Sequence, residues 1–254
     1  MVAWKFLNVV LQLTAVYLNN GYPSSTRQVV NATLPLMPDE PLFWGRAGDV
    51  GMKEEDFTWA VEAYRNALAL GDTTLVGLRN LGLALYLTQA YWEAVGYFEQ
   101  AYATDSTDKL NTFYLAMTHQ RLGAYEEAFF YFEQAKALMG AAALADIATQ
   151  MGVALDALDR TGEAVEAFDL SLRLDEKERD ALFYLARLYD KRGNTEEARS
   201  YYSEFLSSVS EDEMPQLQDM ARERLTALQA ADSPELQASA AADTLATDST
   251  YAPE

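Results

Sequence analysis

The sequence has no cysteine and a single histidine, His119. Without cysteine the chain can form no disulfide framework and offers no thiolate for catalysis or metal binding, and the compartment is left open. One histidine excludes a metal cluster built from several histidines, and it excludes a Ser/His/Asp triad with a further base available. The commonest forms of nucleophilic and metal chemistry therefore have few residues to draw on.

Basic residues are also scarce. The 254 residues include 19 Lys and Arg against 39 Asp and Glu, which gives a formal net charge of −20 at pH 7. A surface of this charge repels phosphate backbones and anionic lipid headgroups. We therefore expect no binding to nucleic acid, and we do not favour association with a membrane.

Glycine and proline are few, at 13 and 7 residues, whereas half of the chain is hydrophobic. The abundance of alanine and leucine favours helix over sheet. A chain of this length can form one or two domains with a substantial core. The composition therefore predicts a helical protein.

A long uninterrupted apolar run is missing at the N-terminus. Asn8 and Gln12 interrupt the mostly apolar residues 1–20, and the segment has no small-x-small cleavage site of the kind that ends a secretory signal. A membrane span needs about 20 predominantly apolar residues. On a helical wheel the polar side chains fall within about 60° of one another: Lys5, Asn8, Gln12 and Asn19. We predict an internal helix whose polar edge meets water or a groove while the remainder packs, and we favour a cytoplasmic protein over a periplasmic or membrane-associated one.

A pattern of small and aromatic residues recurs along the chain at spacings of 34, 34, 36 and 34 residues. Its alanines are Ala60, Ala94, Ala128, Ala164 and Ala198. Four residues after each alanine comes an aromatic residue: Tyr64, Phe98, Phe132, Phe168 and Tyr202. Twelve residues before each alanine comes a small residue: Gly48, Gly82, Ala116, Gly152 and Ala186. Two antiparallel helices approach closely only where one of them lacks a bulky side chain, so the pattern predicts a series of helical hairpins.

This pattern resembles the tetratricopeptide repeat, a helix–turn–helix unit of 34 residues. The residues that carry the resemblance include Trp44, Leu81–Gly82, Tyr189 and the turn glycines Gly123 and Gly193. The resemblance implies an all-α, right-handed α-solenoid of about six repeats. The expected repeats are 7–40, 41–74, 75–108, 109–142, 143–178 and 179–212.

The two ends of the chain differ from these repeats. Residues 1–40 combine an N-terminal helix with a divergent first repeat, which alone ends in the family's proline, at Pro38. Residues 213–231 read as a helix that caps the last repeat. Residues 232–254 are rich in Ala, Ser, Thr and Asp and contain no basic residue, so we expect a disordered acidic tail.

Carboxylate pairs can act as general acids and bases, and this chain has several. Glu126–Glu127 and Glu196–Glu197 lie at the same position of their repeats, in the first turn of the second helix. Negative charge there offsets the helix dipole, which explains the pairs without catalysis. For His119 we expect a packing role. The sequence therefore predicts no catalytic residue, no metal site and no cofactor.

In the tetratricopeptide family one side of each first helix lines a concave groove. The resemblance assigns a partner-binding groove to Arg79, Tyr86, Phe113, Met117, Arg121, Phe183, Arg187 and Lys191. The same helical phase also selects Asn8, Asn19, Asp49, Lys53, Asp146, Asp156 and Asp190. The set Lys/Asn/Lys/Arg with which chaperone-binding members hold a C-terminal carboxylate is missing. Aromatic and arginine side chains supply most interface energy, so Tyr86, Phe113, Met117 and Arg121 form the expected hot spot.

The sequence thus predicts a non-catalytic scaffold that binds a peptide or helix of a partner protein in the groove, with no small-molecule substrate. Two alternatives stay open. The chain can be the C-terminal regulatory region of a larger enzyme or membrane protein, or it can be an assembly factor anchored in a membrane by residues 2–18.

Overall fold

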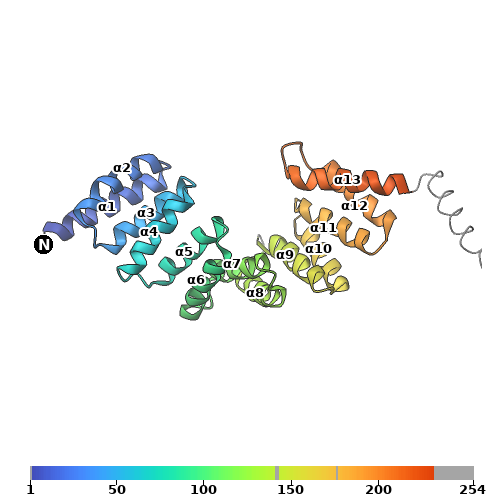
Figure 1. Ribbon diagram of the computed structural model, residues 1–254, viewed down its shortest axis with the longest axis horizontal. Helices are drawn as coiled ribbons and strands as arrows, with labels where there is room; N and C mark the ends of the chain where they lie inside the picture. Colours follow the sequence, from blue (N-terminus) through green and yellow to red (C-terminus); the bar gives the residue numbers. More distant parts are fainter. Residues whose placement is uncertain (1, 141–142, 176, 232–254) are drawn as a thin grey trace, which may run out of the picture. The chain divides into compact units, whose positions relative to one another are not determined.

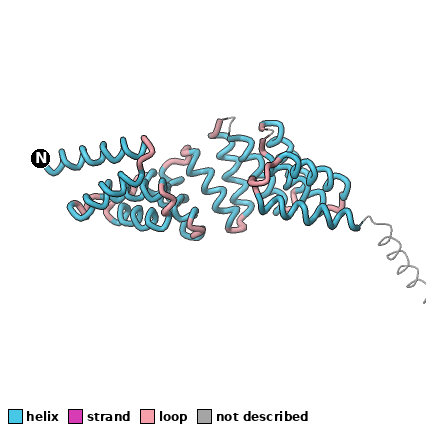
Figure 2. Tube along the Cα trace, turned by 90° about the horizontal axis from the view of Figure 1, so that it is seen from above, coloured by secondary structure: helices cyan, strands magenta, loops and turns pink. Residues whose placement is uncertain are grey.

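The computed structural model describes residues 2–140, 143–175 and 177–231. Every regular element of this part of the chain is helical, with thirteen α-helices, one short 3₁₀ turn and short connecting loops (Figures 1 and 2). The expected all-α solenoid of helical repeats is confirmed. The predicted acidic tail, residues 232–254, lies outside the described residues.

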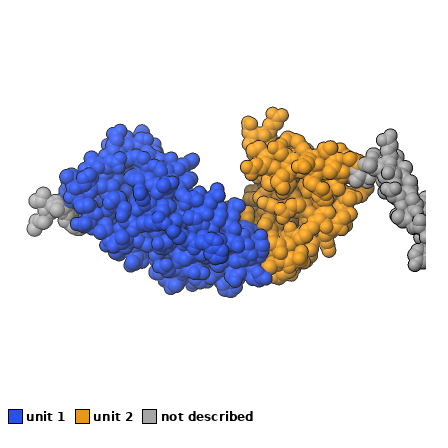
Figure 3. Space-filling model, viewed as in Figure 1, with its two compact units in different colours: residues 1–139 blue, residues 140–254 orange. Residues whose placement is uncertain are grey.

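The chain divides into two compact units, residues 1–139 and residues 140–254 (Figure 3). The helices of the first unit are α1 Val2–Asn19, α2 Pro23–Thr33, η1 Leu34–Leu36, α3 Pro41–Lys53, α4 Phe57–Ala69, α5 Leu75–Leu87, α6 Tyr91–Thr104, α7 Lys109–Arg121 and α8 Tyr125–Leu138. Those of the second unit are α9 Leu144–Ala157, α10 Thr161–Leu174, α11 Arg179–Lys191, α12 Thr195–Ser208 and α13 Pro215–Ala231. Odd-numbered helices from α1 to α11 are the first helices of hairpins. Each hairpin falls on one expected repeat range, although α1 begins before residue 7.

Capping side chains and acidic residues mark the N-termini of several helices. The side chains of Asp56, Thr74 and Asp108 accept hydrogen bonds from backbone N–H groups in the first turns of α4, α5 and α7. Glu126 and Glu127 lie in the first turn of α8, and α12 begins with an equivalent pair, as predicted. The capping side chains satisfy backbone N–H groups that have no partner within the helix. The glutamates offset the positive end of the helix dipole.

The two helices of a hairpin touch where a small residue faces an aromatic ring. A Cβ atom added to Gly82 would lie 2.8 Å from Cε1 of Phe98, and one added to Gly152 would lie 2.5 Å from Cε1 of Phe168. Both rings are fully buried. The recurring alanines, Ala128 among them, are equally inaccessible. The packing predicted from the repeat pattern is therefore present in the structure.

A tight turn joins the two helices of each hairpin, and one residue of that turn has a positive φ. The residues are Gly21, Glu55, Gln89, Gly123, Asp159 and Gly193, with φ between 56° and 78°. The left-handed conformation costs an L-residue about 1–2 kcal/mol and costs glycine little. The turn is thus kept in repeats that have no glycine, because the packed helices on either side hold it.

Ala128→Leu tests the packing between α7 and α8. Its Cβ is buried, so the larger side chain should overpack the hairpin and cost about 1–3 kcal/mol of unfolding free energy. Urea denaturation followed by circular dichroism measures the loss. The control is Ala137→Leu, an exposed position of the same helix, which should change stability little. Equal effects of the two substitutions would show that the register of α8 is wrong.

Gly123→Ala tests the turn between α7 and α8. With φ at 75°, the added Cβ should cost about 1 kcal/mol. Gly96 lies inside α6, where an added Cβ would have no atom within 4 Å, so Gly96→Ala should stabilise the protein by about 0.5–1 kcal/mol. Denaturation midpoints that move in opposite directions are the expected result, and a stabilising Gly123→Ala would contradict it.

Candidate functional site

A hollow of the first unit lies among its first helices. Its volume is about 410 Å³. The lining side chains are Leu18 and Asn19 at the end of α1, Arg46, Asp49, Met52 and Lys53 of α3, Tyr64 of α4, and Asn80 and Leu83 of α5. We call this hollow the α3–α5 pocket. A second hollow of about 200 Å³ shares four of these residues, so the two are continuous.

A half-buried carboxylate organises the polar side of the α3–α5 pocket. Asp49 accepts a hydrogen bond from the Tyr64 hydroxyl over 2.9 Å and pairs with Arg46 over 3.0 Å. Burial raises the pKa of Asp49, and the Tyr64 hydrogen bond and the Arg46 charge partly oppose this rise. Burial and then the Asp49 charge raise the pKa of Tyr64, which remains a hydrogen-bond donor. Leu18, Met52 and Leu83 form the apolar part of the lining.

Sequence reasoning found part of this pocket. The helical phase selected Asn19, Asp49 and Lys53 for the groove, but it did not select Arg46 or Asn80. These two residues are 34 positions apart, and Asn80 directly follows Arg79, which the phase did select. The separation of 34 residues, the length of one repeat, was the signal in the sequence that Arg46 and Asn80 occupy equivalent positions.

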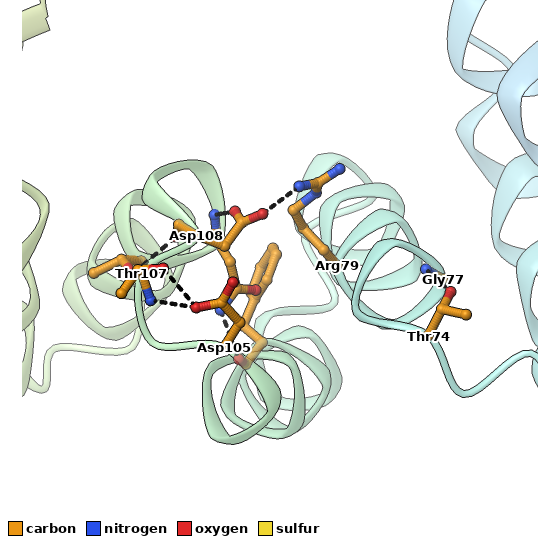
Figure 4. A network of polar contacts seen from close by, with 9 residues as sticks. Thr74, Gly77, Arg79, Asp105, Thr107 and Asp108 are labelled. Atoms are coloured by element: carbon orange, nitrogen blue, oxygen red, sulfur yellow. Dashed lines mark hydrogen bonds and ion pairs between the residues drawn. The ribbon is translucent and has the colours of Figure 1, made fainter. Parts of the chain in front are cut away.

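Arg79 has a structural partner. Its guanidinium pairs with Asp108 over 2.6 Å, and the two side chains are only 19% and 14% exposed. Asp108 in turn accepts a hydrogen bond from the backbone N–H of Asn111 over 2.8 Å, which caps α7 (Figure 4). Arg79 therefore links α5 to the start of α7, the first helix of the next repeat, and its charge is already engaged.

The other predicted residues of the first unit come together. The Tyr86 ring lies 5.6 Å from that of Tyr114, and the Phe113 ring lies 5.5 Å from that of Tyr114. The Tyr86 hydroxyl accepts a hydrogen bond from Nε of Arg121 over 3.3 Å. Arg121 is exposed, while Met117 is half-buried one turn after Phe113. We call these five residues the Tyr86 cluster, of which sequence reasoning missed only Tyr114.

In the second unit, the expectation that Phe183 lines an accessible groove is wrong. Phe183 is 2% exposed, and its ring lies 5.9 Å from that of Tyr202 and 5.6 Å from that of Phe205. The repeat of α8 has Ala135 at the position that Phe205 occupies in α12. In the last repeat the Phe205 ring packs against Phe183, and Phe183 is buried in the core.

Arg187 and Lys191 are exposed at the positions expected of them, and both carry a partner. Each pairs with Asp156 of α9 over 3.2 Å, and Lys191 also pairs with Asp159 over 3.1 Å. Asp156 itself is buried, so these contacts neutralise a carboxylate that water scarcely reaches. The two cations therefore hold α11 to α9.

Carboxylates gather at the start of α11. Burial, followed by the charges of Asp180, Asp146 and Asp175, raises the pKa of Glu178 to about 7. Burial also raises the pKa values of Asp180 and Asp146. Sequence reasoning missed Glu178, because the grouping depends on the approach of α9 to α11.

His119 is a packing residue, as predicted. It is buried and stacks on Tyr131 with ring centroids 5.4 Å apart. Burial lowers its pKa, and the charges of Glu99 and Glu127 only partly compensate. No three His, Asp or Glu residues of the described chain are grouped so that they could hold a metal ion.

Two family models described as the tetratricopeptide repeat match the chain, one over residues 114–138 and the other over residues 180–211. The chain is a tetratricopeptide-repeat protein. These matches fall on α7–α8 and α11–α12, where the small and aromatic residues pack as described above. Proteins built from this repeat are generally non-catalytic scaffolds for protein–protein interaction.

Solved structures of the same fold are similar over most of the chain. The type IV pilus biogenesis factor PilW aligns with a TM-score of 0.68 and 18% identity, covering 84% of this chain and 97% of PilW. PilF of Pseudomonas aeruginosa aligns with a TM-score of 0.64 and 21% identity, covering 85% of this chain and 96% of PilF. YrrB, described as a TPR protein with an unusual peptide-binding site, aligns with a TM-score of 0.61 and 18% identity, covering 66% of this chain and 85% of YrrB. At these identities the likeness establishes the fold.

A search of curated protein sequences finds no match. Among the described residues, no helix has the length and apolar character that crossing a membrane requires.

Glu178→Gln tests the carboxylate group at the start of α11. The folded-state pKa of about 7 lies above the ordinary value of 4.5, so the folded state holds its proton more tightly and stability falls as pH rises from about 4.5 through 7. Glutamine removes that loss, so the variant should be more stable than the parent chain at pH 8 and gain little at pH 4. Urea denaturation at both pH values measures this.

The matched control is Glu163→Gln in the same unit. The Arg160 side chain lowers the pKa of Glu163, so this substitution should give no gain in stability at pH 8. A gain for Glu178→Gln that is the same at pH 4 and pH 8 would contradict the assignment.

Proposed function

We propose that the first unit binds an extended segment of a partner protein across the α3–α5 pocket and the Tyr86 cluster. The observation that carries the proposal is the pocket itself, which combines an apolar lining with hydrogen-bonding groups. Leu83 of the pocket and Tyr86 of the cluster are three residues apart on α5, so they are neighbours on one face of that helix. The two features together form one continuous surface.

The chemistry of this surface suits a peptide. Leu18, Met52 and Leu83 can surround one apolar side chain of the partner, and such anchors dominate recognition. The amides of Asn19 and Asn80 each carry donors and an acceptor, which match the alternating N–H and C=O groups of an extended backbone. The similar structure YrrB is described as having a peptide-binding site, which supports this class of ligand.

Charge favours a neutral or basic segment. The chain carries a net charge of −20, which steers cations toward it and repels acidic peptides at a distance. Asp49 adds a half-buried carboxylate beside the apolar lining. Several cations near the first helices are already paired with carboxylates, including Arg46 and Arg79, so they offer little to an acidic ligand.

The surface is formed before any partner arrives. The Tyr86 ring is held between those of Tyr91 and Tyr114, and the Tyr64 hydroxyl is fixed by Asp49. Binding to side chains that are already ordered loses less conformational entropy. We therefore expect binding with little rearrangement of the first unit.

The test starts from peptides selected from a random phage-displayed library on the immobilised full chain. Selected sequences should contain an apolar anchor and no excess of acidic residues. Asn80→Ala combined with Arg121→Ala should weaken their binding by at least about tenfold, or about 1.4 kcal/mol, in isothermal titration calorimetry. Circular dichroism should show unchanged helicity.

The control is Arg173→Ala combined with Arg192→Ala, which changes exposed residues of the second unit and should leave the affinity unchanged. Two results would overturn the proposal. One is that no sequence is enriched over an unrelated protein. The other is that the first double variant binds the selected peptides as tightly as the parent chain does.

A further inference from the structure

Helix α1 exposes a row of large apolar side chains. Phe6, Val9, Leu13 and Val16 are between 39% and 61% exposed. They follow one another at intervals of three, four and three residues, which places them within about 80° of helix surface. This is the a/d spacing with which one helix packs against another in a coiled coil. We call this row the α1 seam.

Within the part of the chain that the structure describes, nothing covers this row, and the other faces of α1 are turned to the unit or carry polar side chains. Leu7, Val10 and Leu18 point into the unit and pack in clusters with Phe43 and Ala47. Gln12 and Asn19 form the polar edge that the sequence predicted, and they are exposed. The sequence-based expectation that the remainder of α1 packs is therefore only half right, because the helix has one more apolar face than the unit buries.

Helix α13, the last that the structure describes, presents a different outer surface. On α13 the exposed positions are mostly polar, including Asp219, Arg222 and Glu223, as suits a helix that faces water. The large apolar side chain that it exposes is Met220. An exposed apolar row is thus not shared by the first and last described helices.

Charge identifies the occupant of the α1 seam. All 39 acidic residues follow position 38, and the only charged residues before it are Lys5 and Arg27. The Arg27 guanidinium is engaged with Glu54 and Asp56, over 2.6 and 2.7 Å. Two copies of a chain with a net charge of −20 repel each other. The N-terminal end is the segment through which two copies can meet without opposing their carboxylates.

We propose that the α1 seam is the interface of a symmetric homodimer, in which α1 packs against α1 of a second copy about a two-fold axis. A two-fold interface needs a patch that is complementary to itself. A row with a/d spacing meets this need, because each side chain fits between those of an identical row. The seam runs for only about 15 Å along the helix, so the dimer is a reversible one.

The homodimer is independent of the peptide-binding function. The α3–α5 pocket uses Leu18 and Asn19 at the end of α1, whereas the α1 seam uses residues 6–16 on another face of the helix. A dimer would leave the pockets of both copies available. Two linked pockets would bind a partner with two recognition segments more tightly than one pocket does.

Sedimentation velocity of the full chain over a wide range of concentration tests the dimer. The apparent mass should rise from 28.3 kDa toward twice that value. Added salt should promote dimerisation, because it screens the repulsion between the acidic bodies and leaves the uncharged seam intact. Val9→Lys combined with Val16→Lys should keep the chain monomeric throughout, with unchanged helicity and thermal midpoint.

Two further variants make the test specific. Leu13→Ala, a smaller change in the same row, should weaken the dimer by at least about tenfold. Trp92→Lys replaces an apolar side chain of α6 that is 81% exposed, and it should dimerise like the parent chain. This control separates the α1 seam from any other exposed apolar residue.

The proposal is overturned if the chain stays monomeric at every concentration and salt level, or if the double lysine variant still dimerises. It is also overturned if the chain binds vesicles of phosphatidylglycerol and phosphatidylcholine through the same residues without associating with itself. That result would assign the α1 seam to a lipid surface.

Discussion

The structure depends on a single contact repeated along the chain, in which a small residue on one helix receives an aromatic ring from the next. Gly82 with Phe98 and Gly152 with Phe168 leave no room for even one additional carbon atom. This contact sets the distance between the helices of a hairpin, because a larger residue would force them apart. Once that distance is fixed, the left-handed turn residue is held in place even where it is not glycine, as at Gln89.

Successive repeats are joined by a second kind of contact, ion pairs between residues about one repeat apart. Arg79 with Asp108 and Lys191 with Asp156 are examples. Asp108 and Asp156 are largely removed from water, so each needs a cationic partner, and the pairs fix the orientation of one repeat against the next. They also bear on the proposed recognition, because a cation that is paired within the protein offers less to a ligand. What remains for recognition in the first unit is an apolar and amide-lined pocket beside a cluster of tyrosine and phenylalanine rings.

The candidate site shows how far sequence reasoning reaches. Tyr86, Phe113 and Arg121 lie together as their helical phase predicted, since residues on one face of α5 and α7 must be neighbours when the hairpins stack. Phe183 has the same phase as Phe113, yet it is buried, because Phe205 stands where the earlier repeat has alanine. The pairing of Arg79 with Asp108 could not be predicted either, since it depends on how closely two long side chains approach. The α3–α5 pocket became visible only when three first helices were placed side by side.

The sequence by itself determined the helices, their pairing and the residues that face each other inside a hairpin. Helical geometry is fixed at about 3.6 residues per turn, so a regular spacing of small and aromatic residues has one structural interpretation. The tertiary structure decided which apolar residues are covered and which charges are neutralised. Those outcomes depend on the size and reach of side chains from other repeats, for which no spacing rule exists. Val9 and Val10 are an example. They are adjacent in α1, yet Val9 lies in the exposed α1 seam and Val10 lies in the core.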